Sequence, residues 1–236
     1  MEYEMKTGQS FFSAIVLTVL LSLITGCQTR AEKGITLSPD LEKMYKGLNS
    51  FVNDLYVLHK KRLEGREFYI TEEVGGYGGL TNDLEFYNKV NYYDSKSKRL
   101  LSTIKWEKKN PDNIHMIDLF VYDNKGRLKR KYAAAYLPSR RVSPFVTLIS
   151  LHYYRNNTHS FREFDVYNVR TYEQCNDIKD AKKIYFAFHY EDIPDSYREL
   201  DVEKHDKYRA CFEHASSTVE PYNSPLSELA ETNIDS

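Results

Sequence analysis

The chain has 236 residues, with 33 Lys and Arg against 34 Asp and Glu, and a formal net charge of −1. This balance gives no overall charge that would attract nucleic acid or a strongly acidic substrate. The length suits one domain that can bury a core without metal ions or many disulfides. Twenty Tyr and 12 Phe against one Trp favour β-sheet, where amphipathic rings suit a half-buried pleated surface.

The first 26 residues have the order of an export signal. Residues 1–10 are polar, and residues 11–24 form an almost unbroken apolar run. This run is shorter than the roughly 20 residues that a membrane-spanning helix needs. A short apolar run that ends in small residues is typical of a cleavable signal. The alternative interpretations are an ordinary secretory signal or an uncleaved anchor.

The segment Leu23-Ile24-Thr25-Gly26-Cys27 closes the apolar run. It resembles the lipobox of bacterial lipoproteins, in which a branched apolar residue stands three positions before an invariant cysteine and a small residue stands just before it. Ile24 occupies the position where leucine is commoner. The resemblance implies a thioether-linked diacylglycerol on Cys27, cleavage before Cys27 and acylation of its amino group. Two or three acyl chains would hold the protein on a membrane, whereas one chain binds only marginally.

Gln28 follows the cysteine, where an aspartate retains many such lipoproteins at the inner membrane. The resemblance therefore favours the periplasmic face of the outer membrane, if the organism has one. No further apolar span follows, so we expect everything after Cys27 to lie outside the cytoplasm. We divide the chain into a signal peptide (1–26), a lipidated tether (27–37), a single α+β domain (38–215) and a loosely ordered acidic tail (216–236) without Lys or Arg.

A long helix is predicted at the start of the domain. Ser38-Pro39-Asp40 supplies an N-cap, a proline at the first helical position and an acid in the first turn. Lys60, Lys61 and Arg62 suit the last turn, and Gly65 suits the C-terminal cap. Apolar residues recur between these ends at helical spacing, which predicts one buried stripe: Leu41, Met44, Leu48, Phe51, Leu55 and Leu58.

Beyond Gly65 the apolar pattern changes to a period of two, which predicts strands. The glycine-rich residues 75–79 interrupt this pattern as a loop. The links between strands are too short for helical crossovers, so neighbouring strands should be antiparallel. We predict a curled antiparallel meander of about six to eight strands, packed against the N-terminal helix and followed by short helical segments. The strands are expected over residues 68–71, 84–93, 100–107, 114–122, 128–136, 145–153, 160–166 and 184–190.

Two cysteines remain once Cys27 is assigned to lipid. An exported protein usually oxidises such a pair, so we predict a disulfide between Cys175 and Cys211. Closing a loop of this length stabilises a fold by roughly 3–4 kcal/mol in the chain-entropy model. The alternative is two separate buried thiols.

The sequence carries no nucleophile elbow, zinc-protease motif or phosphate-binding loop, so no catalytic residue or cofactor is predicted. One constellation of histidines can be drawn. If Asn156-Asn157 is a two-residue turn, Tyr154 pairs with His159 and His152 with Phe161. His152, His159 and Glu163 would then share a face and could bind zinc. Ordinary cross-strand packing is the favoured interpretation, so no metal site is predicted.

A basic cluster is the most credible working surface. Arg127, Lys129 and Lys131 alternate and therefore share one strand face, and Arg140 and Arg141 lie in the next loop. Near a membrane such a surface could bind anionic headgroups, lipopolysaccharide, peptidoglycan acids or an acidic protein. The alternative is an edge strand protected from aggregation by its charges.

These features favour a non-catalytic envelope lipoprotein, a binding or assembly module with an anionic envelope polymer or an envelope protein as its partner. The alternatives are an envelope hydrolase and a small-ligand carrier with a pocket between helix and sheet. A carrier would show a sizeable apolar cavity, and an enzyme would show titratable groups clustered within one.

Overall fold

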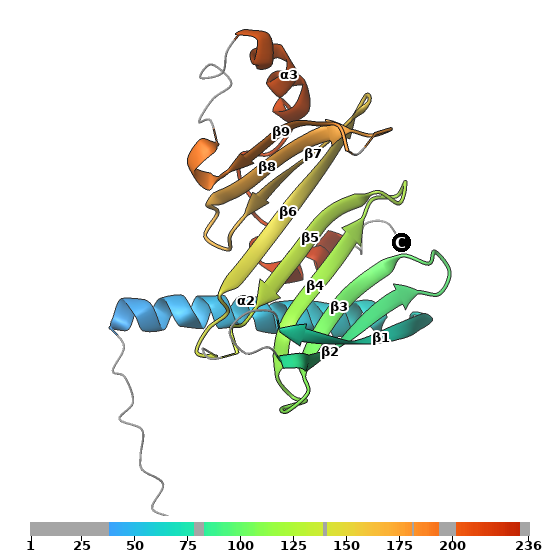
Figure 1. Cartoon of the computed structure of the whole chain (residues 1–236), viewed down its shortest axis with the longest axis vertical. Helices are drawn as coiled ribbons and strands as arrows, with labels where there is room; N and C mark the ends of the chain where they lie inside the picture. The colour runs from blue at the N-terminus through green and yellow to red at the C-terminus, as the bar shows by residue number, and fades with distance from the viewer. Residues whose placement is uncertain (1–37, 78–82, 139–140, 181, 194–201, 232–236) are drawn as a thin grey trace, which may run out of the picture. The chain divides into compact units, whose positions relative to one another are not determined.

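A computed structural model of the chain describes residues 38–77, 83–138, 141–180, 182–193 and 202–231 (Figure 1). The signal peptide, Cys27 and the tether lie outside the described residues. From Pro39 onward the described chain belongs to one unit. Among the described residues, no helix is long and apolar enough to span a bilayer.

Helix α2 spans Pro39–Leu63, as the capping signals predict. Asp40 and Glu42 occupy its first turn, and three cations occupy its last turn, so both ends complement the helix dipole. The predicted apolar stripe is buried in the second half of the helix, at Phe51, Leu55 and Leu58. Its first turns are more open: the side chain of Leu41 is 40% exposed.

Nine antiparallel strands follow and pair in chain order from β1 to β9. The predicted α+β fold, with a meander, one N-terminal helix and short C-terminal helices, is confirmed. The prediction missed β8 and placed the end of β1 too early. The strands are β1 (Phe68–Tyr77), β2 (Asp83–Asp94), β3 (Leu100–Glu107), β4 (Ile114–Tyr122), β5 (Leu128–Ala135), β6 (Val146–Arg155), β7 (Thr158–Phe164), β8 (Arg170–Asp177) and β9 (Ile184–His189).

Glycines 75 and 76 continue strand β1, whereas the sequence predicted a loop over residues 75–79. Gly75 pairs with Tyr87 of β2, and a Cβ at Gly75 would lie 2.5 Å from the Tyr87 ring. Glycine here lets the Tyr87 ring lie directly over the backbone of β1. Residues 78–82 lie outside the described part of the chain.

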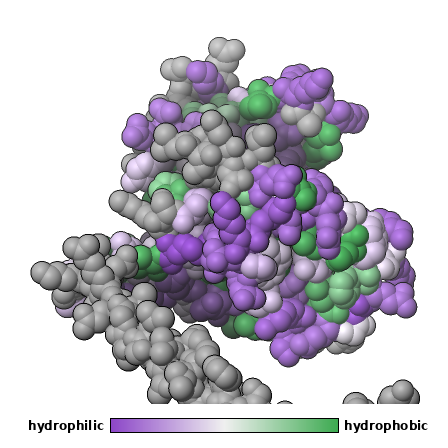
Figure 2. All heavy atoms as spheres, turned by 60° about the horizontal axis from the view of Figure 1, so that its bottom comes forward, coloured by the Kyte–Doolittle hydropathy of each residue, from purple (hydrophilic) through white to green (hydrophobic). Residues whose placement is uncertain are grey.

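The core lies on one face of the sheet. Leu119, Tyr132, Ile149 and Phe164 align across four neighbouring strands and are almost completely buried. Helix α2 packs on this face and crosses behind the strands in Figure 1. No described helix packs on the opposite face, which carries polar and aromatic side chains. On the face of the molecule drawn in Figure 2, hydrophobic residues form small groups between hydrophilic ones.

Residues 216–231 pack onto the core, which corrects the loosely ordered tail expected over 216–236. This segment contains the short helices η4 (Pro225–Ser227) and α4 (Glu228–Glu231). Val219 is fully buried in the core cluster. The Glu228 carboxylate forms a buried ion pair with the Arg130 guanidinium and accepts a hydrogen bond of 2.6 Å from the Tyr132 hydroxyl. The polar composition of the segment therefore reflects specific buried contacts rather than disorder.

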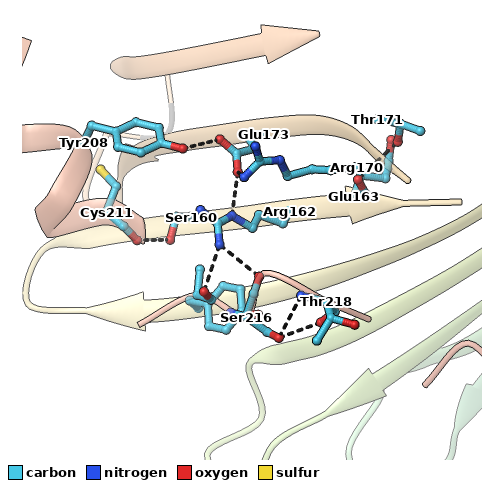
Figure 3. A network of polar contacts seen from close by, with 12 residues as sticks. Ser160, Arg162, Glu163, Arg170, Thr171, Glu173, Tyr208, Cys211, Ser216 and Thr218 are labelled. Carbon is cyan, nitrogen blue, oxygen red and sulfur yellow. Dashed lines mark hydrogen bonds and ion pairs between the residues drawn. The ribbon is translucent and has the colours of Figure 1, made fainter. Parts of the chain in front are cut away.

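Helix α3 (Val202–Phe212) packs on the core face of β7 to β9. The predicted disulfide is present and joins Cys175 of β8 to Cys211 of α3. Beside it lies a polar network (Figure 3) in which the Glu173 carboxylate accepts hydrogen bonds from Arg162 Nε at 2.5 Å and from the Tyr208 hydroxyl at 2.8 Å. One covalent and several polar links thus fix α3 to the sheet.

Candidate functional site

A cleft opens where strands β5 and β6 separate. Their pairing runs only as far as Arg130 and Leu151. Beyond this point the β4–β5 and β6–β7 hairpins diverge (Figure 1). The cleft has a volume of about 290 Å³. Its lining comes from both hairpins and from the end of α3: Asp123, Arg127, Leu128, Lys129, His152, Tyr153, Tyr154, Arg155, Cys211 and His214.

The β4–β5 turn fixes Arg127 at the edge of this cleft. The Asp123 carboxylate accepts hydrogen bonds from the backbone N–H groups of Lys125 and Arg127, at 3.0 and 2.8 Å, which closes the turn. The same carboxylate forms an ion pair of 2.7 Å with the Arg127 guanidinium, which stacks on Tyr154 at 4.6 Å. Burial acts to raise the pKa of Asp123, but the hydrogen bonds from Arg127 outweigh it and hold this pKa below its ordinary value. The guanidinium is therefore held in place before any ligand arrives.

The structure separates the five predicted basic residues. Arg127 and Lys129 line the cleft, whereas Lys131 forms an ion pair of 3.3 Å with Asp118. Arg141 forms an ion pair with Glu107 at a different place, and Arg140 lies outside the described residues. Arg127 and Lys129 lie beyond the last pair between β5 and β6, where β5 is paired only with β4 and charges also protect a sheet edge. Arg155, from the β6–β7 hairpin, joins Arg127 and Lys129 in the cleft lining.

The histidine pair of β6 and β7 lies beside these cations. The register is the predicted one, with Tyr154 opposite His159 and His152 opposite Phe161. His152 Nδ1 and His159 Nε2 are 3.0 Å apart and share a hydrogen bond, with the two rings parallel to within 8°. The Glu163 carboxylate accepts a hydrogen bond from Ser150 instead of approaching the imidazoles. The described residues contain no group of three or more His, Cys, Asp and Glu placed to hold a metal ion.

Both imidazoles are neutral near pH 7. Burial, followed by the neighbouring His159 and Lys131, lowers the pKa of His152 to about 3. Burial also lowers the pKa of His159. A general base needs a pKa near the working pH, so His152 is poorly suited to proton transfer. It supplies a flat, uncharged wall to the cleft.

The buried histidines predict a loss of stability on acidification. Burial, together with Arg62 and Lys60, lowers the pKa of His59 to about 4. Since an unfolded histidine titrates near 6.5, the unfolded chain binds more protons than the folded chain below that pH. We expect the free energy of unfolding to fall from pH 6.5 towards pH 4, by up to about 1.4 kcal/mol per pH unit for each of His59 and His152.

Urea denaturation at pH 7, 6 and 5 measures this effect. In the His59→Asn variant the free energy of unfolding should depend less steeply on pH, because one buried histidine is gone. The asparagine amide can still hydrogen-bond with the Ser102 hydroxyl, which His59 contacts at 2.8 Å. Equal stability at pH 7 and pH 5 would contradict the prediction.

Asp123 and His214 also line the cleft, and no sequence pattern assigns them to a site. His214 follows α3 and lies far along the chain from the two hairpins, so no spacing pattern connects it with them. Asp123 lies in the short link between β4 and β5, and aspartate is common in such turns, so its presence there does not indicate a site. The disulfide partner Cys211 brings this end of α3 to the cleft.

A second, more open hollow of about 540 Å³ lies between α2 and strands β1 to β4. Tyr56 of α2 and Trp106 of β3 contact each other edge to face, with ring centroids 6.0 Å apart. Its position matches the pocket between helix and sheet that a small-ligand carrier would need. Its lining is Tyr56, Glu72, Asn88, Val90, Trp106, Pro111, Asp112 and Ile114.

Comparison with known proteins gives no family for this chain. No family model matches it, and no curated protein matches it. Among solved structures, it shows a likeness to the crystal structure of a DUF3836 family protein from Parabacteroides distasonis. That likeness has 8% sequence identity and a TM-score of 0.23, over 50% of this chain and 96% of the other. A TM-score this low carries no argument about fold or function.

Proposed function

We propose that this protein is a lipid-anchored envelope lipoprotein whose domain is a non-catalytic binding module for anionic groups. The observation that carries the proposal is the convergence of Arg127, Lys129 and Arg155 on one cleft. Ion pairs with Asp123 and Glu213 neutralise part of the charge of Arg127 and Arg155. The export signal and the lipobox-like segment ending at Cys27 support the location on a membrane.

The chemistry of the cleft favours binding over catalysis. Its described lining includes no Ser, no Thr and no free thiol, because Cys211 is in the disulfide. Asp123 is committed to the turn, and His152 is neutral and stacked on His159. A guanidinium held in a fixed orientation matches the geometry of a carboxylate or a phosphate. The small volume suits one such group, carried by a larger envelope polymer or protein.

The Arg127→Ala/Lys129→Ala variant should bind envelope material about tenfold or more weakly, since hydrogen bonds to charged groups contribute roughly 1.5–3 kcal/mol. Co-sedimentation of detergent-extracted protein with purified envelope polymers, over a series of salt concentrations, measures the binding. The matched control is Lys108→Ala/Lys109→Ala, which removes the same charge from exposed positions in the β3–β4 link, at the end of the sheet opposite the cleft hairpins. Equal weakening in both variants would show that only the net charge of the protein matters, which contradicts a specific cleft. Unchanged binding of the cleft variant would refute the proposal.

A small-ligand carrier is the second candidate, and the hollow beside Tyr56 favours it. The hollow joins aromatic and aliphatic walls to the carboxylates of Glu72 and Asp112, the mixture usual in small-molecule sites. Trp106 lines it and is the sole tryptophan of the chain. Its fluorescence would therefore report directly on whether a ligand occupies the hollow.

A further inference from the structure

Five exposed hydrophobic side chains lie in three segments that meet at the first half of α2. They come from three separate segments: the first turn of α2, the link between β5 and β6, and the turn between β7 and β8. We call them the α2-start patch. Its members and their exposed fractions are Leu41 (40%), Val142 (61%), Phe145 (72%), Tyr167 (52%) and Val169 (40%).

Hydrogen bonds hold these segments together. The Tyr167 hydroxyl donates to the backbone carbonyl of Met44 at 3.2 Å. The Asn49 amide donates to the backbone carbonyl of Val142 at 2.7 Å. Met44 and Asn49 both lie within the first three turns of α2, so the two hydrogen bonds attach both segments to the first half of the helix.

The β7–β8 turn holds its two members of the patch in an ordered conformation. The Asp165 carboxylate accepts hydrogen bonds from the backbone N–H groups of Tyr167 and Val169, each at 2.9 Å. The patch is therefore a fixed surface. Exposed apolar groups that include aromatic rings, here Phe145 and Tyr167, are typical of interaction sites.

The charges of the described residues around the patch balance. The first turns of α2 carry Asp40, Glu42, Lys43 and Lys46, and Arg141 is paired with Glu107. An uncharged patch with aromatic members fits the boundary between headgroups and acyl chains, where Phe and Tyr are favoured. The described residues of the patch and its surroundings have no excess of cations for a strongly anionic partner.

The chain before α2 limits where this patch can lie. Twelve residues lead from Cys27 to Pro39, and even fully extended they reach about 40 Å. If Cys27 is lipidated, the start of α2 must stay within that distance of the bilayer. We propose that the α2-start patch rests on the same bilayer that holds Cys27; this inference depends on the lipid anchor of the proposed function.

This contact would aim the cleft away from the membrane. In a meander, the β5–β6 and β7–β8 links lie at one end of the sheet, and the β4–β5 and β6–β7 hairpins lie at the other (Figure 1). The ten residues of β6 separate the two ends by about 30 Å. The anionic partner of the cleft is then a polymer or protein beyond the membrane surface, and the headgroups of the anchoring bilayer are out of its reach.

Quenching by brominated lipid tests the orientation. The acylated protein carries Trp106→Phe with Phe145→Trp, and is reconstituted in phosphatidylcholine vesicles with brominated or ordinary acyl chains. We expect brominated chains to remove about half or more of the fluorescence, since interfacial side chains penetrate roughly 5–10 Å into the acyl boundary. The matched control, Trp106→Phe with Ile178→Trp, places the probe in the β8–β9 link, at the end of the sheet that holds the β4–β5 and β6–β7 hairpins. This side chain is 44% exposed, and the tryptophan should keep its fluorescence.

Equal quenching at both positions, or none at Phe145→Trp, would overturn the inference. If Phe145→Trp does not fold, Tyr167→Trp provides a second probe in the same patch. Flotation of the protein with the vesicles separates the two levels of the proposal. A protein that does not float refutes the lipid anchor, whereas a protein that floats without quenching refutes only the orientation.

Discussion

A chain that ends at Ser216 should lose about 5 kcal/mol or more of its free energy of unfolding. The missing segment leaves Arg130, which is 3% exposed, without the carboxylate of Glu228. The deletion also removes Tyr222, Leu226 and Leu229, which pack against the core cluster, and a fully buried side chain of this kind contributes roughly 1.5–3 kcal/mol. The loss of the fully buried Val219 adds roughly 1.5–3 kcal/mol. A domain of ordinary stability would be largely unfolded after such a change.

Urea denaturation followed by circular dichroism measures the loss. A chain that ends at Glu231 is the control, since it lacks only residues outside the described part and should unfold at the same midpoint as the full chain. If the chain ending at Ser216 kept that midpoint, residues 217–231 would indeed be the loose tail that their composition suggests.

The Glu173→Leu variant should lose about 3–5 kcal/mol of unfolding free energy. Glu173 is fully buried and accepts hydrogen bonds from Arg162, Arg170 and Tyr208 (Figure 3). The Arg162 guanidinium also donates to the backbone carbonyls of Ala215 and Ser216, at 2.8 and 2.9 Å. Leucine fills a similar volume but leaves this guanidinium buried without a counter-charge.

The control for Glu173 is Glu213→Leu. Glu213 forms an ion pair of 3.4 Å with Arg155, and both side chains are about half exposed. A pair in water contributes roughly 0–1 kcal/mol, so this variant should unfold close to the unsubstituted midpoint. Similar losses in the two variants would show that the network in Figure 3 does not fix α3 to the sheet.

Periodicity predicted most of the elements, and its failures have physical reasons. Strand β8 was missed because its inward positions hold Glu173 and Cys175, which give no apolar alternation. Their burial depends on Arg162 and on the disulfide, neither of which is local in sequence. The composition of the C-terminal segment predicts a tail for the same reason. Its acid Glu228 is buried because it forms an ion pair with Arg130, which lies on a distant strand.

The candidate site was predicted in pieces. Alternation placed Arg127 and Lys129 on one face, and a guessed turn placed His152 beside His159. These residues line one cleft because β5 and β6 stop pairing after Arg130 and Leu151, and no residue type in the sequence indicates where that pairing ends. His214 reaches the cleft only through the packing of α3, which a linear pattern does not contain.

The chain-order pairing of the sheet has a consequence for how the molecule assembles. Each strand pairs with its sequence neighbours, so the contact order of the sheet is low and successive hairpins can zip together rapidly. The seal of the core comes from residues 216–231, the last described part to be synthesised. A nascent chain can therefore form its hairpins early. The part of the core beside Arg130 stays exposed until residues 216–231 have been synthesised and have folded onto it. Protection by chaperones matters most during this interval.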